Sequence, residues 1–180
     1  MKSNSMHVFF TIFIASICTL LFGCSDENTP QDDKTEVVET VSSDVWYSIE
    51  EAQERAEAED KKIVIAVYTE WCTICRRMDR EVFANDNILE TFTDYFYPVR
   101  LNAESDKKVE FNGELYTESE LALAFGVYSY PTTVFVDEDG SPVGSQPGYI
   151  EKDLYKDILV FVGSNAYKSE SFDNFKSKNL

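Results

Sequence analysis

The chain has 180 residues, 43% of them hydrophobic and 14% aromatic, which is enough for one domain with a proper core. It carries 33 acidic against 16 basic residues, a net charge of −17. This balance argues against nucleic acid as a partner and against electrostatic binding to anionic lipid, because both need a basic surface.

Residues 1–23 have the pattern of a secretory signal peptide. Lys2 precedes an apolar stretch of 15 residues, Val8 to Phe22, which is too short for a typical membrane span. The stretch ends at Gly23-Cys24 and resembles a bacterial lipoprotein signal, in which cleavage leaves Cys24 as a lipidated N-terminus. This predicts a lipid-anchored protein of the bacterial cell envelope that faces the periplasm. The alternative is an ordinary signal peptide with a chance cysteine.

Removal of that signal would discard His7, the only histidine, together with Cys18. With Cys24 lipidated, Cys72 and Cys75 would be the only free thiols, so a structural disulfide framework is excluded. A Cys–His protease and a Ser–His–Asp hydrolase are excluded too, because each needs an imidazole base. Residues 24–44 are predicted to form an acidic, disordered linker, since polar and acidic residues dominate there.

Residues 45–163 are predicted to form the folded domain. Ser48 is expected to cap a helix that runs to about Asp60 and is closed by Lys61-Lys62. The β-branched run from Ile63 to Tyr68 predicts a strand buried on both faces.

A Cys-x-x-Cys pair, Cys72 and Cys75, follows this strand and precedes a helix predicted over Arg76 to Phe83. A helix N-terminus presents unpaired N–H groups and a positive dipole end, which favour a thiolate over a thiol. This is the setting of a redox dithiol, and Cys72 is expected to be the more exposed of the two.

The rest of the domain continues to alternate between helices and strands. In chain order there follow a helix capped by Asn85, a strand over Phe96–Leu101, a short hairpin within Ala103–Tyr116, a helix capped by Thr117 and stopped by Gly126, a strand over Thr132–Val136, a turn at Asp137–Gly140, a return strand at Val143 and a helix from about Glu151 to Val162. This order predicts an α/β fold with a central mixed sheet flanked by helices on both faces. Residues 164–180 form a C-terminal extension whose aromatic residues are expected to pack back onto the domain.

Trp71-Cys72-x-x-Cys75 after a strand and Tyr130-Pro131-Thr132 before a hairpin together resemble the thioredoxin superfamily, over about Trp46 to Val162. The closer resemblance is to the C-terminal domain of the thiol:disulfide interchange reductases of the bacterial envelope and to related lipoproteins. It implies a thioredoxin-like fold and a thiol:disulfide oxidoreductase that acts on protein disulfides as a monomer, without cofactor or metal. A membrane interchange protein would be its electron donor.

By this resemblance Cys72 attacks a substrate disulfide and Cys75 resolves the mixed disulfide, so that a redox-active Cys72–Cys75 disulfide forms. Pro131 is expected to be cis, and the backbone of Tyr130 is expected to bind an extended substrate. Trp71 is interpreted as a plate that faces the substrate, with a merely packed aromatic as the alternative.

The chain departs from the family at Ala66, where thioredoxins carry a buried acid that accepts the proton of the resolving cysteine. Asp79, one helical turn after Cys75, and Glu70 are the two candidates to replace that acid. Each is equally well interpreted as a solvated surface acid. The acidic neighbourhood predicts a reductant-like potential, nearer that of thioredoxin than that of a strong oxidant.

Two other functions fit the same residues. Cys72 and Cys75 could hold Cu(I), whereas a closed zinc site needs four ligands. The fold could also serve as an adaptor that only binds partners.

Overall fold

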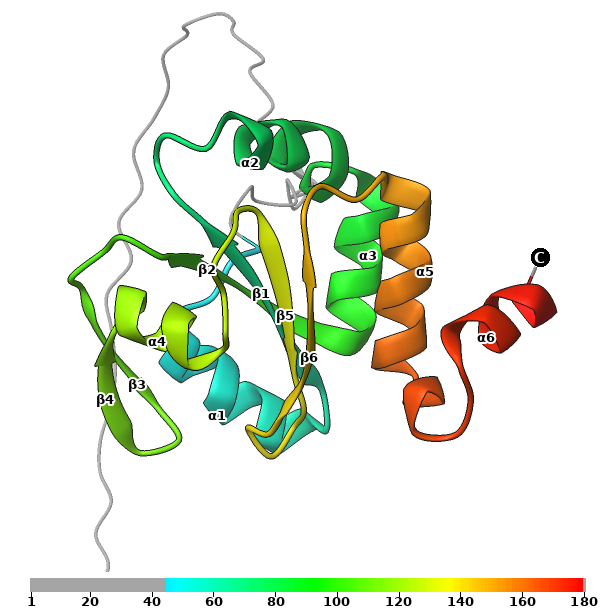
Figure 1. The fold of residues 1–180 in the computed structure, drawn as a ribbon. Coiled ribbons are helices and arrows are strands. Elements are labelled where there is room, and N and C mark those ends of the chain that lie inside the picture. Colours follow the sequence, from blue (N-terminus) through cyan, green and yellow to red (C-terminus); the bar gives the residue numbers. More distant parts are fainter. Residues whose placement is uncertain (1–44, 180) are drawn as a thin grey trace, which may run out of the picture. The chain divides into compact units, whose positions relative to one another are not determined.

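The structure is a computed structural model that describes residues 45–179 (Figure 1). Its main sheet has the strand order β2-β1-β5-β6. The strands are β1 (Lys62–Tyr68), β2 (Phe96–Asn102), β5 (Thr132–Val136) and β6 (Pro142–Pro147). β1 and β2 are parallel, and the β1–β5 and β5–β6 pairs are antiparallel, which confirms the predicted mixed sheet.

The side chains of β1 alternate between two hydrophobic cores, one on each face of the sheet. Ile63, Ile65 and Val67 lie in the core with the first and fourth helices and a two-stranded hairpin, namely α1 (Ile49–Glu59), α4 (Glu118–Ala124), β3 (Lys108–Phe111) and β4 (Glu114–Thr117). Val64 and Ala66 lie in the opposite core, with α3 (Asp86–Tyr95) and α5 (Lys152–Gly163). Figure 1 shows α3 and α5 packed side by side on that face.

Helix caps form at the polar residues that the sequence indicated. The Ser48 hydroxyl accepts a hydrogen bond from the backbone N–H of Glu51 (3.1 Å). Thr117 and Glu120 form a reciprocal capping box at the start of α4. Gly126 follows α4 with φ +72°, a conformation that glycine adopts without steric cost. These caps fix where α1 and α4 begin and where α4 ends.

The helix after the cysteine pair begins earlier than predicted and changes its geometry. α2 spans Thr73–Met78, with Cys72 as its N-cap, and Asp79–Phe83 form a π-helical turn, η1. The prediction of one regular helix over residues 76–83 is therefore wrong. Met78 and Val82 are nevertheless buried, because the π turn still directs the apolar side chains toward the core.

Lys62 is the first residue of β1 rather than the end of a helix. Its side chain is 2% exposed, and its ammonium pairs with Asp137 and with Glu138 (2.8 Å) at the β5–β6 turn. A lysine is buried to this extent only when its charge is paired, so the two carboxylates explain why the strand can begin there.

The chain after α5 packs back onto the domain, as predicted. It forms a short 3-10 helix, η2 (Ala166–Lys168), and α6 (Phe172–Asn179). The Tyr167 hydroxyl donates to Asp137 (2.9 Å). The rings of Phe172 and Phe175 each lie 5.3 Å from the ring of Phe161 on α5.

The predicted signal peptide, Cys24 and the linker lie outside the described residues. Within residues 45–179, no helix is long and apolar enough to cross a membrane.

Candidate active site

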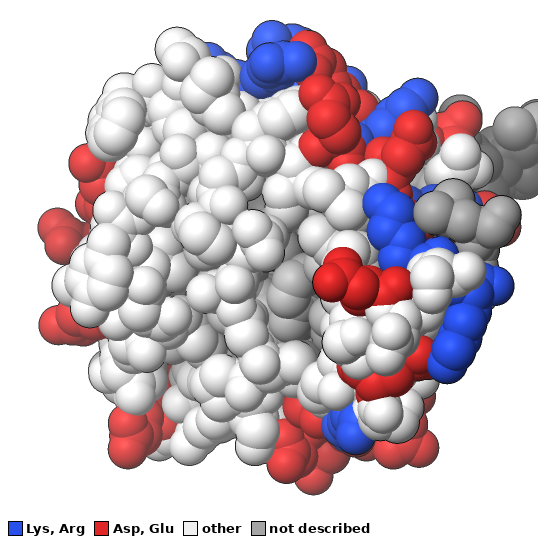
Figure 2. All heavy atoms as spheres, turned by 45° about the vertical axis from the view of Figure 1, so that its right-hand side comes forward, with Lys and Arg blue, Asp and Glu red and all other residues white. Residues whose placement is uncertain are grey.

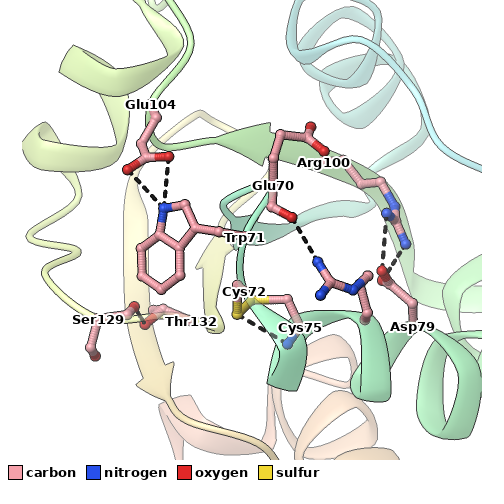
Figure 3. Close-up of a disulfide and its surroundings, with 10 residues drawn as sticks. Glu70, Trp71, Cys72, Cys75, Asp79, Arg100, Glu104, Ser129 and Thr132 are labelled. Carbon is pink, nitrogen blue, oxygen red and sulfur yellow. Dashed lines mark hydrogen bonds and ion pairs between the residues drawn. A yellow bond between two sulfur atoms is a disulfide. The ribbon is translucent and has the colours of Figure 1, made fainter.

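Cys72 and Cys75 are joined by a disulfide at the start of α2 (Figure 3). Their Cα atoms are 5.3 Å apart, and the backbone N–H of Cys75 donates to the Cys72 Sγ atom (3.1 Å). The expected contrast in exposure is small, since Cys72 is 5% and Cys75 4% exposed. The reason is that Cys72 is the N-cap residue, with its backbone N–H bonded to the Thr69 carbonyl oxygen, which turns its sulfur inward.

Trp71, beside the disulfide, is 64% exposed. Its indole N–H donates to both carboxylate oxygens of Glu104, at 3.0 and 2.9 Å. Its ring stands edge-on to that of Tyr130, with centroids 6.2 Å apart. An exposed aromatic held in one orientation beside a reactive pair fits the interpretation of Trp71 as a plate that faces the substrate better than that of a packed aromatic.

The loop before β5 lies against the cysteine pair. The Tyr130–Pro131 peptide bond is cis, as expected. Two hydrogen bonds hold the loop in place. The Thr132 hydroxyl donates to the Ser129 carbonyl oxygen (2.7 Å), and the Gly148 N–H donates to the Pro131 carbonyl oxygen (2.7 Å). Pro131 lines a small cavity together with Cys75. The structure thus brings Tyr130 and Pro131 to the disulfide.

Asp79, the first residue of η1, forms an ion pair with Arg100 of β2. A second hydrogen bond between the same two groups is 3.4 Å long, so the guanidinium donates to both carboxylate oxygens. The Arg100 guanidinium also lies over the ring of Trp46, 4.6 Å from its centroid. Asp79 is therefore a partnered, half-buried acid rather than a freely solvated one.

A small cavity separates Asp79 from the disulfide. It is lined by Ala66, Val67, Tyr68, Cys75, Asp79, Phe83, Arg100 and Pro131. About 10 Å³ of it is open to the centre of a water molecule, which is about the space that one water needs. Burial raises the pKa of Tyr68, with a further contribution from nearby Glu70, so this hydroxyl stays protonated. Ala66, where the resemblance to thioredoxins implies an acid, is one of the residues that line this cavity.

Glu70 is exposed, and Figure 3 shows its carboxylate directed away from the disulfide. Its backbone carbonyl oxygen accepts a hydrogen bond from the Arg76 guanidinium (2.7 Å). The structure therefore brings Asp79, and not the Glu70 carboxylate, to the cavity beside Cys75.

Two residues of the site, Arg100 and Glu104, were not predicted from the sequence. A charged residue inside the apolar run before Leu101 was the available signal for Arg100, because a lone arginine in a buried strand needs a partner. No local signal distinguishes Glu104 from the other acids of its loop.

The surface on the Pro131 side of the disulfide lacks charge. The segments 126–136 and 141–150 contain no Asp, Glu, Lys or Arg, although 27% of the chain is charged. They form the loop before β5, β5 itself and β6. Figure 2 shows the side of the molecule that bears β6 as a broad uncharged surface, with charges gathered at its margins. Within residues 45–179, no group of three or more His, Cys, Asp or Glu is placed to hold a metal ion.

Comparison with known proteins gives two curated relatives that are longer than this chain. The chloroplastic thioredoxin-like protein HCF164 of Oryza sativa subsp. japonica is 28% identical over 111 residues, which cover 62% of this chain and 37% of that protein. The thiol:disulfide interchange protein DsbD of Actinobacillus pleuropneumoniae is 26% identical over 115 residues, 62% of this chain and 18% of that protein. The chain thus spans well under half the length of these relatives.

Solved structures show the same fold. A thioredoxin-fold protein from Helicobacter pylori superposes with a TM-score of 0.59 at 21% identity, covering 66% of this chain and 80% of that one. The profile of the thioredoxin-like domain family matches residues 49–163, which is more than half of the chain. The chain therefore belongs to the thioredoxin-like domain family, and it carries a Cys72–Cys75 disulfide.

Proposed function

We propose that this chain reduces disulfide bonds in other proteins by dithiol exchange through Cys72 and Cys75. The observation that carries the proposal is the Cys72–Cys75 disulfide at the N-terminus of α2, beside the exposed indole of Trp71 and the Pro131 loop. The uncharged surface on the Pro131 side of this site suits a polypeptide substrate, because a partner that docks there need not match the strong negative charge of the chain.

The reaction begins from the reduced form. The Cys72 thiolate attacks one sulfur of a substrate disulfide, the substrate S–S bond breaks, and one substrate thiolate leaves. Cys75 then loses its proton and attacks Cys72 in the mixed disulfide, which releases the second substrate thiolate and forms the Cys72–Cys75 disulfide. Two electrons pass from the protein to the substrate.

Asp79 is the better candidate to accept the Cys75 proton. Both residues line the water-sized cavity, so one water can relay the proton between them. Glu70 stays the second candidate, and the direction of its carboxylate argues against it.

Several acids near the cysteine pair support a reductive direction. Glu70 adjoins Trp71, Glu104 binds its indole, and Asp79 follows Cys75 by one turn. Negative charge disfavours the Cys72 thiolate and so the reduced protein, which makes the dithiol a better reductant. The protein then needs a supply of electrons, and we propose a membrane thiol:disulfide interchange protein, the class to which the relative DsbD belongs by name.

We also propose that Cys24 carries the lipid that anchors the chain to the membrane on the periplasmic side of a bacterial envelope. The support is the apolar run that ends at Gly23-Cys24. Cys24→Ser should move the protein from the membrane fraction to the soluble fraction. Mass spectrometry of the membrane-bound chain should find a lipidated residue 24 as its N-terminus.

Reduction of insulin by dithiothreitol tests the proposed activity. The full chain should accelerate the precipitation of insulin, and Cys72→Ser should abolish this effect. Cys24→Ser is the matched control, because it also replaces a cysteine by serine but leaves the Cys72–Cys75 pair intact. If the full chain is inactive, or if one Cu(I) per chain binds with no disulfide exchange, the proposal is wrong.

A further inference from the structure

Arg100 on β2 lies next to the position where the acid expected in the family is missing. In the parallel β1–β2 pair it lies opposite Ala66, the position where the expected acid is missing. A guanidinium in a strand that is otherwise buried needs an anion close by. Asp79 supplies that anion from the helix above, so a cation on β2 and an acid on η1 meet over the gap left by Ala66.

The position of the Arg100 guanidinium is fixed from several sides. Its planar group lies 4.6 Å from the ring centroid of Trp46 and 5.9 Å from that of Tyr68. The guanidinium also donates a hydrogen bond to each carboxylate oxygen of Asp79. Because the guanidinium is planar, stacked on rings and bound through two hydrogen bonds, it restrains the orientation of the Asp79 carboxylate. A lysine ammonium at the same position would not restrain it in this way.

We propose that Arg100 is a positioning residue for the resolving step, which it serves by holding the Asp79 carboxylate at the cavity beside Cys75. The proposal rests on the proposed function of the Cys72–Cys75 pair. When Cys75 attacks the mixed disulfide, its proton passes through the cavity water to Asp79, and the thiolate of the leaving group departs with the electron pair of the broken S–S bond. Arg100 makes no contact with the reacting sulfurs and acts only through Asp79.

Dithiobis(nitrobenzoate) separates the two steps on the reduced full chain. Attack by Cys72 releases one coloured thionitrobenzoate, and resolution by Cys75 releases the second. Stopped-flow absorbance should therefore show two phases, and Cys75→Ser should remove the second one. If the wild-type chain shows no release at all, the proposed function itself fails, an outcome distinct from a failure that concerns Arg100 alone.

Arg100→Gln is the decisive variant. Near neutral pH its second phase should slow about tenfold or more, since a displaced general base loses much of its catalytic effect. Its first phase should stay within about twofold of the wild-type rate. Asp79→Asn should slow the same phase, and the double variant should be no slower than Asp79→Asn alone, because one residue acts through the other.

Arg55→Gln is the matched control. Arg55 also pairs with an acid, Glu51, and stacks on an aromatic ring, Tyr47, but it lies on α1 and does not line the cavity. Both phases should keep their wild-type rates in this variant. Urea unfolding of each variant identifies any that is unfolded under the assay conditions.

The pH profile gives an independent readout. Cys75, Asp79, Tyr68 and Arg100 are the titratable groups that line the cavity, and Pro131, Phe83, Val67 and Ala66 complete it. At alkaline pH hydroxide ionises the thiol directly, so the defect of Arg100→Gln should shrink as the pH rises. A second phase at the wild-type rate, an equal slowing of both phases, or a defect that does not change with pH would overturn the proposal.

Discussion

The indole N–H of Trp71 donates to both carboxylate oxygens of Glu104, at 3.0 and 2.9 Å. This contact joins the residue before the disulfide to the loop that follows β2. It fixes the orientation of a large exposed side chain before any partner arrives, and such pre-organisation lowers the entropic cost of binding.

Removal of the Glu104 carboxylate should weaken substrate binding. We expect Glu104→Ala to raise the KM for insulin by about threefold to tenfold, the equivalent of one typical hydrogen bond, with little change in kcat. Tryptophan fluorescence should report a more mobile Trp71, while Trp46 stays packed against Phe83 and Phe92. Glu104→Gln keeps one acceptor oxygen, so its KM should lie between those of the wild-type chain and Glu104→Ala. An unchanged KM in the alanine variant would contradict a positioning role.

The resolving role of Cys75 predicts a covalent trap. In Cys75→Ser the attack by Cys72 still occurs, but no second thiol can displace the substrate, so mixed disulfides should accumulate. Non-reducing electrophoresis and mass spectrometry of membranes that contain this variant should identify the partners. The variant that lacks both Cys72 and Cys75 serves as control and should capture none. Trapping by Cys72→Ser and not by Cys75→Ser would mean that the roles of the two cysteines are reversed.

The gap at Ala66 predicts that an acid placed there can replace Asp79. Asp79→Asn should slow the second release of thionitrobenzoate, and Ala66→Asp in that background should restore it to within about threefold of the wild-type rate. The reason is that residue 66 faces both Arg100 and the cavity. Ala66→Asn in the same background is the isosteric control that cannot accept a proton. Equal rates for the two double variants would exclude the acid as the cause.

The buried ion pair at the start of β1 predicts a pH-dependent stability. Burial alone would raise the pKa of Asp137, but hydrogen bonds with Glu138, Lys62, Lys168 and Tyr167 outweigh it and hold that pKa well below its usual range. A carboxyl whose pKa is lowered on folding stabilises the protein above its unfolded pKa, near 4, and this contribution disappears as the pH falls toward the folded value.

Asp137→Asn should therefore lower the free energy of unfolding by about 2 kcal/mol near neutral pH, because it leaves a buried lysine with one partner fewer. The difference from the wild-type chain should narrow as the pH falls below about 4. Urea unfolding at several pH values measures both effects. Asp157→Asn is the control, since the ion pair of Asp157 with Lys176 (3.4 Å) is exposed and should contribute little. A difference that does not change with pH would contradict the assignment.

Local patterns predicted most of the fold. The β-branched run at Ile63, the Thr117 capping box and the glycine after α4 each act within a few residues, so the sequence alone reveals them. The cysteine pair and Tyr130-Pro131 were likewise visible as short motifs at a spacing typical of one family.

The contacts that were missed depend on tertiary geometry. The Asp79–Arg100 pair depends on the β1–β2 register and on the packing of η1 against the sheet, and neither can be predicted from a short stretch of sequence. The burial of Lys62 depends on two acids that lie some 75 residues further along the chain. The π turn that begins at Asp79 was also not predicted, because its residues have ordinary helical periodicity.

The two sulfurs lie beneath the surface, whereas the neighbouring Trp71 and Ile74 are 64% and 46% exposed. A partner's disulfide must therefore pass two exposed apolar side chains to reach the buried sulfurs. Bridges on protruding loops or chain ends can make that approach, but bridges flush with a rigid surface cannot. Under the proposed function, access to the buried sulfurs, more than redox potential, would then decide which proteins this chain reduces.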